Sequence, residues 1–176
     1  DNFIIFYPEG YDYQAKESLY FLEKNISQIS KITGNEFENK IPVIIEDRGQ
    51  YSNAFADTIN NKMGIFSYVA GSNSNLANYK NWYRLVSTHE LTHIGHMTNN
   101  SALSSKIIKI FGNTFSPNLH SPISLIEGTA VYSESQLSPS VGRLNGGYYH
   151  EIFKAKAAEG EIPSLAEVNY NHRLFP

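Results

Sequence analysis

Two histidines four residues apart, with a glutamate beside the first, are the residues of this sequence that could do chemistry together. They are His89, Glu90 and His93, in the stretch His-Glu-Leu-Thr-His. Side chains four residues apart lie on one face of a helix, so both imidazoles can bind one zinc ion. Glu90 would lie near the metal without binding it, where its carboxylate can take a proton from zinc-bound water. The pattern therefore predicts metal-assisted hydrolysis.

The spacing of apolar residues predicts that this pattern lies on a helix. Residues 81–97 contain no proline and a single late glycine, and their apolar side chains recur every three or four residues. The resulting face comprises Trp82, Leu85, Val86, His89, His93 and His96 or Met97. Two inward-facing histidines that only form hydrogen bonds are the alternative to a metal site. The placement on one helix face favours the metal.

A catalytic zinc ion needs a third protein ligand, which leaves the fourth position for water and substrate. In the long form of the motif, a glycine follows the first histidine by seven residues and a third histidine follows it by ten. Those positions are His96 and Asn99 here, and Gly95 is one residue out of place. We therefore exclude a three-histidine site and expect a glutamate from a downstream helix.

Glu127 is the strongest candidate for that third ligand. It lies in a predicted helix among apolar neighbours, which are Leu125, Ile126, Ala130 and Val131. An ionised carboxylate in apolar surroundings is costly unless it is paired, and a zinc ion is a strong partner. Gly128 would allow a close approach of another helix or of the metal site. A solvent-facing glutamate on an amphipathic helix is the alternative.

The two motifs together resemble the gluzincin clan of zinc metallopeptidases, specifically its bacterial peptidase MA-like families. The resemblance covers roughly residues 79–135 and rests on HExxH and on the run Glu-Gly-Thr-Ala-Val-Tyr-Ser-Glu at 127–134. It implies that His89, His93 and Glu127 bind zinc and that Glu90 is the general base and later a proton shuttle. It also implies a zincin-like fold with residues 64–69 as the edge strand beside the cleft, where an extended peptide could add as a further strand.

An oxyanion-stabilising residue is also expected from the resemblance, because many gluzincins use a tyrosine or histidine after the glutamate helix. Tyr149 is the candidate, together with its neighbours Tyr148 and His150. The group could instead lie beyond residue 176. The sequence departs from the family pattern before the glutamate, where residues 123–126 lack the usual aromatic side chain.

Glu134 and the remaining histidines carry less specific predictions. Glu134 lies two helical turns beyond Glu127 on the same face, where it could orient a zinc ligand through the second ring nitrogen or could be a surface charge. His96 is expected to pack beside the site or to support it. His120 and His172 lie in loop-like sequence and are expected to be structural or solvated.

The order of predicted elements indicates an α+β fold: a small mixed sheet packed on an amphipathic helix, followed by the HExxH helix and the glutamate-bearing helix. Strands are predicted at residues 3–7, 41–46 and 64–69, and helices at residues 13–33, 81–97, 101–111 and 121–136. Gly34 and Gly112 would end two of these helices, and Ser121 with Pro122 would begin the last. Residues 70–79 form a predicted loop.

Length and composition fit one globular domain, because the 176 residues are 41% hydrophobic and 18% charged. We expect a sheet subdomain with the active-site helix in residues 1–96 and a mostly helical subdomain in residues 97–176. The chain starts at Asp1, without methionine, directly before an apolar run. This start is typical of a piece cut from a longer protein.

Charge and hydropathy exclude several partners. The net charge is −3 and lysines and arginines do not cluster, so nucleic acid is not an expected partner. No run of eighteen apolar residues exists, so this segment has no predicted membrane span. The lack of cysteine excludes disulfides and thiolate ligands. A removed leader, together with the family resemblance, predicts an extracytoplasmic location, secreted or associated with the envelope.

These features predict a zinc-dependent peptidase that hydrolyses peptide bonds through a zinc-bound water activated by Glu90, with a peptide or protein as substrate. The alternative is a zincin-fold binding or scaffolding module of a larger envelope protein, which keeps the site but catalyses weakly. A hydrolase with another substrate is a third option, because fold and metal do not fix the substrate.

Overall fold

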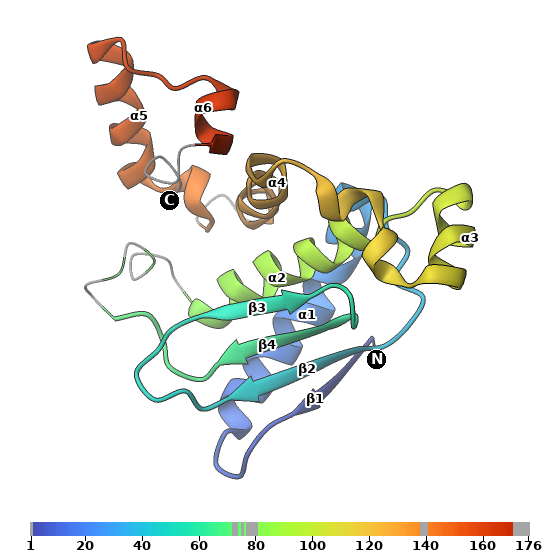
Figure 1. Ribbon diagram of the computed structural model, residues 1–176. Coiled ribbons are helices and arrows are strands. Elements are labelled where there is room, and N and C mark those ends of the chain that lie inside the picture. Colours follow the sequence, from blue (N-terminus) through green and yellow to red (C-terminus); the bar gives the residue numbers. More distant parts are fainter. Residues whose placement is uncertain (1, 72–73, 75, 77–80, 138–140, 171–176) are drawn as a thin grey trace.

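A four-stranded sheet with helices packed on one of its faces forms the N-terminal half of the molecule (Figure 1). The computed structural model describes residues 2–71, 74, 76, 81–137 and 141–170. The predicted loop at 70–79 lies mostly outside the described residues, and His172 lies outside them. The strands are β1 (Phe3–Phe6), β2 (Ile41–Glu46), β3 (Ala54–Asp57) and β4 (Lys62–Phe66).

The sheet is mixed, with the strand order β1-β2-β4-β3. β1 pairs with β2 and β2 with β4 in parallel, whereas β3 pairs with β4 antiparallel. Buried and partly buried residues alternate along β2, so that Ile41, Val43 and Ile45 face the helices. The predicted α+β class is confirmed by this arrangement of a small mixed sheet and packed helices.

β3 is the edge strand next to α2 (Trp82–Thr98), whereas the sequence predicts residues 64–69 at the edge. That prediction is wrong because β3 pairs with the outer side of β4. The turn at residues 58–61 joins the two strands as an antiparallel hairpin. In the turn, Asn60 donates from its backbone and its side chain to Asp57, at 3.0 and 2.7 Å, and Asn61 has φ 50°. The sequence does not predict β3 because its four residues, Ala-Phe-Ala-Asp, include no β-branched side chain.

α1 (Asp12–Thr33) packs across the buried face of the sheet, as its helical spacing predicts. Its inward side chains include Ala15, Leu22 and Ile29, which belong to the core formed with β2 and β4. The helix ends at Gly34, as expected. Gly34 has φ 71° and its N–H donates to the Ser30 carbonyl at 2.8 Å, a left-handed cap that glycine adopts at little cost.

α2 lies along α1 and against β3 and β4, and most of its residues are buried. The side chain of Asn81 caps the helix by accepting a hydrogen bond from the Arg84 N–H at 3.1 Å. Asn25 of α1 donates to the Thr88 hydroxyl at 2.9 Å within the buried interface. Because Thr88 directly precedes His89, this contact with α1 helps set the position of the predicted zinc-binding motif.

The C-terminal half is helical. Its helices are α3 (Ala102–Phe111), α4 (Ile123–Gln136), α5 (Gly147–Glu159) and α6 (Leu165–Tyr170), with three short 3-10 turns, η1 (Asn113–Phe115), η2 (Pro117–His120) and η3 (Arg143–Asn145). Ser101 and Gly112 flank α3 as predicted. Pro122, predicted as the first helical residue after Ser121, lies before α4 because it is extended, with φ −52° and ψ 139°. No helix in the described part of the chain is long and apolar enough to cross a membrane, as the sequence predicts.

Gly95, and not Gly128, marks a close approach between elements. A Cβ atom at Gly95 would lie 2.7 Å from Oγ1 of Thr33 and 2.9 Å from Cζ of Phe37, whereas no described residue has an atom within 4 Å of one at Gly128. Within the described part of the chain, the prediction that Gly128 marks the approach of another helix or of the metal site is therefore wrong.

Replacing each of these glycines by alanine should shift stability in opposite directions. Gly95→Ala forces α1 and α2 apart and should lower the free energy of unfolding by about 1–3 kcal/mol. Gly128→Ala adds a methyl group in open space and should raise it by about 0.5–1 kcal/mol, because alanine favours helix. Urea titrations of both variants measure the changes. A stabilised Gly95→Ala would contradict the packing described for α1 and α2.

Candidate metal centre

The two histidines of the motif face α4 from neighbouring turns of α2, so the pattern lies on a helix as predicted. The side chains of His89 and His93 are only 13% and 8% exposed. Their rings are almost perpendicular, at 88°, with centroids 4.6 Å apart. The two imidazoles therefore meet edge to face, with their Nε2 atoms close together.

α4 supplies the carboxylates of the site. Glu127, Ala130 and Glu134 are spaced three and four residues apart, which places them on one face of the helix, the face toward α2. Leu125 is 56% exposed, so the apolar surroundings inferred from the sequence do not enclose Glu127 on that side. Small side chains on the buried face, at Ala130 and Ser133, allow α4 to approach α2 closely. Glu127 therefore reaches the histidines directly.

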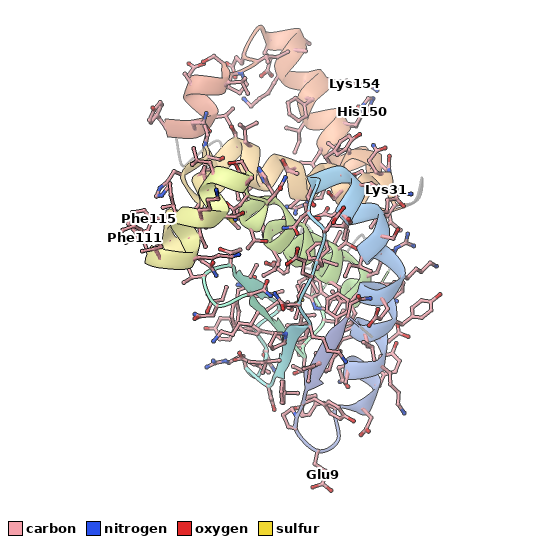
Figure 2. The ribbon with its side chains drawn as sticks, turned by 90° about the vertical axis from the view of Figure 1, so that its right-hand side faces the viewer. Glu9, Lys31, Phe111, Phe115, His150 and Lys154 are labelled. Atoms are coloured by element: carbon pink, nitrogen blue, oxygen red, sulfur yellow. The ribbon has the colours of Figure 1, made fainter. Side chains whose placement is uncertain are left out.

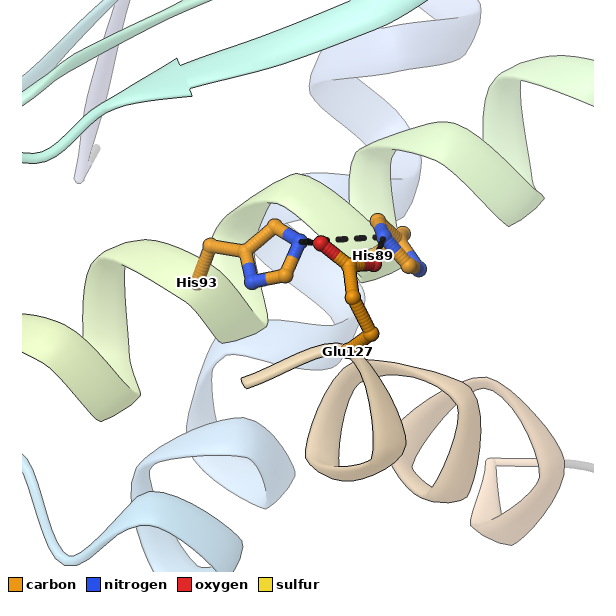
Figure 3. Close-up of side chains that lie close together, drawn as sticks. All are labelled: His89, His93 and Glu127. Atoms are coloured by element: carbon orange, nitrogen blue, oxygen red, sulfur yellow. Dashed lines mark hydrogen bonds and ion pairs between the residues drawn. The ribbon is translucent and has the colours of Figure 1, made fainter. Parts of the chain in front are cut away.

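The donor atoms of His89, His93 and Glu127 converge on one point (Figure 3). Nε2 of His89 lies 3.0 Å from Nε2 of His93 and 3.2 Å from Oε2 of Glu127, and Nε2 of His93 lies 3.6 Å from Oε1 of Glu127. Ligand atoms bonded at 2.0–2.1 Å to one tetrahedral zinc ion are about 3.3–3.4 Å apart. The three residues could therefore hold a metal ion, with the ligand set that the sequence predicts.

The chemistry of these donors also fits a cation. A neutral imidazole nitrogen without a proton and a carboxylate oxygen are both acceptors, and acceptors that face one another need something positive between them. A single proton satisfies only one of the contacts among Nε2 of His89, Nε2 of His93 and Glu127. A metal ion at the centre would interact with all three at once, which makes it the better occupant.

Glu134 fixes the other side of the His89 ring. Its side chain is fully buried, and Oε1 lies 2.7 Å from Nδ1 of His89. With the proton on Nδ1, this nitrogen donates to Glu134, which sets the tautomer and leaves Nε2 free to bind a metal. The sequence allows two roles for Glu134, a surface charge or a partner that orients a histidine. Its burial excludes the surface charge, and its contact with Nδ1 fits a partner that orients His89.

Arg143 completes this arrangement and is not predicted by the sequence. Its guanidinium donates to both oxygens of Glu134, from Nη2 at 2.6 Å and from Nε at 3.1 Å. Nη2 also lies 2.9 Å from Nδ1 of His89. Both nitrogens are donors when Nδ1 carries its proton, so we assign the Arg143 hydrogen bonds to the carboxylate. Arg143 thus neutralises the charge of Glu134, and the same carboxylate orients the ring of His89.

η3 carries Arg143 into place by folding back on the end of α4. Gly142, with φ 93°, lies so close to Ser135 that an added Cβ would come within 2.5 Å of its backbone. The Leu144 N–H donates to the Ser135 hydroxyl at 3.1 Å. No motif marks this turn in the sequence. The only available signal is Glu134, because a buried carboxylate requires a cationic partner from somewhere.

Glu90 is buried beside the cluster and forms no hydrogen bond with any of the described residues. Burial raises the pKa of Glu90 to about 7; the charge of His89 acts against this shift and the charges of Glu127 and Glu134 add to it. A carboxylate in that state can exchange protons near neutral pH. Among the described residues, Glu90 has no hydrogen-bond partner, unlike Glu127 and Glu134.

Negative charge around His89 favours a cation in the cluster. Burial acts against a charge on His89, but hydrogen bonds to Glu127 and Glu134 raise its pKa to about 9. Burial likewise opposes a charge on Glu127, yet its hydrogen bond to His89 lowers the pKa of that carboxyl. Burial, followed by the charge of His89, lowers the pKa of His93. The carboxylates thus stabilise a positive charge on His89, whereas a second positive charge on His93 is disfavoured.

Tyr149, the predicted oxyanion residue, lies in the first turn of α5. Its ring is 5.1 Å from that of Tyr148, and its hydroxyl forms no hydrogen bond within the described part of the chain. Tyr149 does lie near Arg143. Burial lowers the pKa of the Arg143 guanidinium, the hydrogen bonds and charge of Glu134 raise it, and the charge of Tyr149 raises it to a smaller extent. Figure 2 shows His150 on the outer side of α5. The oxyanion role of Tyr149 stays a prediction.

Among the described residues, the other histidines do not enter the cluster. His96 is half-buried on α2 and burial lowers its pKa, which fits the packing role expected for it. His120 is exposed in η2. Nδ1 of His93 is buried without a partner among the described residues, in contrast to Nδ1 of His89. Among the described residues, a hydrogen bond at Nδ1 therefore orients the ring of His89 but not that of His93.

Comparison of the chain with protein-family models, with curated proteins and with solved structures finds no match. The chemistry assigned to the site therefore rests on its own geometry.

Removing the third donor should abolish stable metal binding. In Glu127→Ala, two imidazoles remain and one side of the cluster opens to water. We expect the zinc content of the purified chain to fall from about one ion per chain to close to none after dialysis. Elemental analysis of wild type and variant, prepared in parallel, measures this. Full zinc in Glu127→Ala would show that another residue is the third ligand. Glu151→Gln, at an exposed position on α5, is the matched control and should keep its zinc.

Weakening the support of His89 should have a smaller effect. Glu134→Gln keeps the shape of the side chain but removes the charge that holds Nδ1–H and Arg143. We expect zinc affinity to fall by about 10–100-fold, as is usual when a partner behind a metal ligand is lost. Competition with a chromophoric chelator measures the dissociation constant. An unchanged constant would contradict the orienting role of Glu134.

Proposed function

We propose that this chain is a zinc-dependent peptidase of the gluzincin type. The observation that carries the proposal is the convergence of two imidazole nitrogens and a carboxylate oxygen, 3.0 to 3.6 Å apart, beside a buried glutamate without a hydrogen-bond partner. Three protein donors leave one tetrahedral position open, as catalytic zinc sites require. The resemblance of the two helix motifs to gluzincins supports the same reading.

Zinc is the proposed metal because of the donor types. Two imidazoles and one carboxylate form one of the usual ligand sets of catalytic zinc, whereas magnesium and calcium prefer oxygen donors alone. When bound, zinc would acidify a water molecule and polarise the carbonyl group of the substrate. His89, His93 and Glu127 would hold it, and Glu134 with Arg143 would keep His89 in the binding tautomer.

Glu90 is the proposed general base. It would take a proton from the attacking water while the water oxygen bonds to the peptide carbonyl carbon. It would then pass that proton to the leaving amine nitrogen as the C–N bond breaks. A carboxyl whose pKa lies at about 7 can both accept and return a proton at neutral pH. Burial and the absence of a structural partner suit Glu90 to this role.

The proposed substrate is an extended peptide or protein segment. β3 is the sheet edge on the side of α2, so its outer backbone groups face away from β4. An extended peptide could pair with such an edge through main-chain hydrogen bonds, independently of its sequence. This would align a peptide bond alongside the helix that carries the histidines and Glu90.

Replacing the base alone should separate catalysis from metal binding. In Glu90→Gln, the zinc content should stay at the wild-type value because Glu90 is not a ligand. Peptide turnover should fall by about 100-fold to 10,000-fold, the usual contribution of a general base. A peptide-library digest read by mass spectrometry, with elemental analysis of the same samples, measures both quantities. Glu38→Gln, in the exposed turn after α1, is the matched control and should cleave normally.

The same experiment distinguishes the two candidate functions. Wild-type turnover that survives in Glu90→Gln, with equal zinc, would contradict the mechanism. A wild type that holds zinc but cleaves no peptide would instead indicate a binding or scaffolding module built on this site.

A further inference from the structure

α3 exposes a stripe of large apolar side chains to solvent and buries a serine. Leu103, Ile110 and Phe111 are 72%, 75% and 62% exposed, whereas Ser104 is the one residue of the helix that is buried. The apolar residues, with Ile107, are spaced i, i+4, i+7 and i+8, so they form one stripe. A helix that packs on a protein core normally has the opposite orientation. The stripe is therefore available to something outside this chain segment.

Phe115 of η1 extends the stripe. Its ring lies 5.5 Å from that of Phe111, and Figure 2 shows the two together at the outer edge of the molecule. We use the name α3 patch for Leu103, Ile107, Ile110, Phe111 and Phe115. α3 is capped at both ends, since Ser101 accepts from the Ser104 N–H and the Gly112 N–H donates to the Ile108 carbonyl, and it packs mainly against η1. The patch is thus a protruding feature rather than part of the core.

The charged side chains of α3 itself are positive. Lys106 and Lys109 lie on the same helix, and no aspartate or glutamate occurs anywhere between Glu90 and Glu127. This composition is unusual in a chain whose net charge is −3. Neither lysine forms an ion pair with a described residue. Lys106 therefore borders the apolar stripe, three residues after Leu103 and four before Ile110, and Lys109 lies further round the helix.

We propose that the α3 patch docks onto an anionic lipid surface, with α3 lying in the plane of the interface. Large apolar side chains on one face and lysines beside them are the features that hold a short helix at the boundary between headgroups and acyl chains. α3 has 10 residues and spans about 15 Å, too short to cross the hydrocarbon layer of about 30 Å. The helix can therefore lie on a membrane but cannot traverse it.

A second copy of the chain fits this surface less well. A two-fold symmetric interface places the same patch on both sides, so the lysines of α3 would meet the lysines of the second α3, and neither α3 nor η1 carries a carboxylate to compensate. Lipid phosphates supply the missing negative charge. The docking involves none of the residues of the metal centre, so it does not depend on the proposed peptidase function.

Vesicle flotation tests the docking. The chain is mixed at low salt with vesicles of equal parts phosphatidylglycerol and phosphatidylcholine, and separately with vesicles of phosphatidylcholine alone. We expect binding to the anionic vesicles, weakened by added salt. In Ile110→Ser with Phe111→Ser, the partition coefficient should fall by about tenfold or more, because two large side chains no longer enter the lipid. In Lys106→Gln with Lys109→Gln, it should fall by about tenfold or more toward the value for neutral vesicles.

The matched control changes two equally exposed apolar residues elsewhere. Ile162 and Leu165, near the start of α6, are 60% and 75% exposed. Ile162→Ser with Leu165→Ser should bind anionic vesicles like the wild type. Failure of the wild type to bind them at low salt, or an equal loss in this control, overturns the proposal. A concentration-dependent dimer in sedimentation velocity that is lost in the variant with Ile110→Ser and Phe111→Ser also overturns the proposal. The patch would then be a dimer interface. Circular dichroism checks that each variant is folded.

Discussion

The buried charge of Glu134 constrains the whole candidate metal centre. An ionised carboxylate with no solvent exposure is costly unless cations and donors surround it, and Glu134 has two such partners, His89 and Arg143. His89 comes from α2 and Arg143 from η3, while Glu134 itself belongs to α4. One side chain therefore ties three elements together. Because this contact occupies Nδ1 of His89, the opposite nitrogen is turned toward Glu127 and His93.

Three glutamates in one small region have different surroundings, and these differences fit the separate roles proposed for them. Burial opposes the charge of Glu134, but hydrogen bonds to His89 and Arg143 lower its pKa, so it stays ionised and structural. Glu127 is partly exposed and lies against two imidazoles, as a metal ligand would. Glu90 is buried without a hydrogen bond, and burial raises its pKa to about 7. Environments that push the pKa values of like groups apart are a general mark of acid–base chemistry.

Helices and strands with a clear local sequence pattern are predicted correctly. The apolar spacing of residues 13–33 with Gly34 behind them corresponds to α1, and the β-branched run at 41–46 corresponds to β2. β3 escapes prediction because a four-residue strand next to a hairpin is stabilised by its neighbour and not by its own residues. Its omission also misplaces the sheet edge. The prediction for Gly128 fails for a related reason. A glycine in a helix permits another element to pack closely, but the sequence does not show whether any element does so.

The sequence by itself determined which residues could act as ligands and base, because the spacing of His89, Glu90 and His93 is a property of any helix that contains them. It also indicated Glu127 through the downstream run that ends at Glu134. Only the tertiary structure decided that the donor atoms of α2 and α4 meet within 3.6 Å, and that Glu134 turns inward. It alone brought Arg143 to the site. The physical reason is that helix spacing is local, whereas the neutralisation of a buried charge depends on which distant segment folds against it.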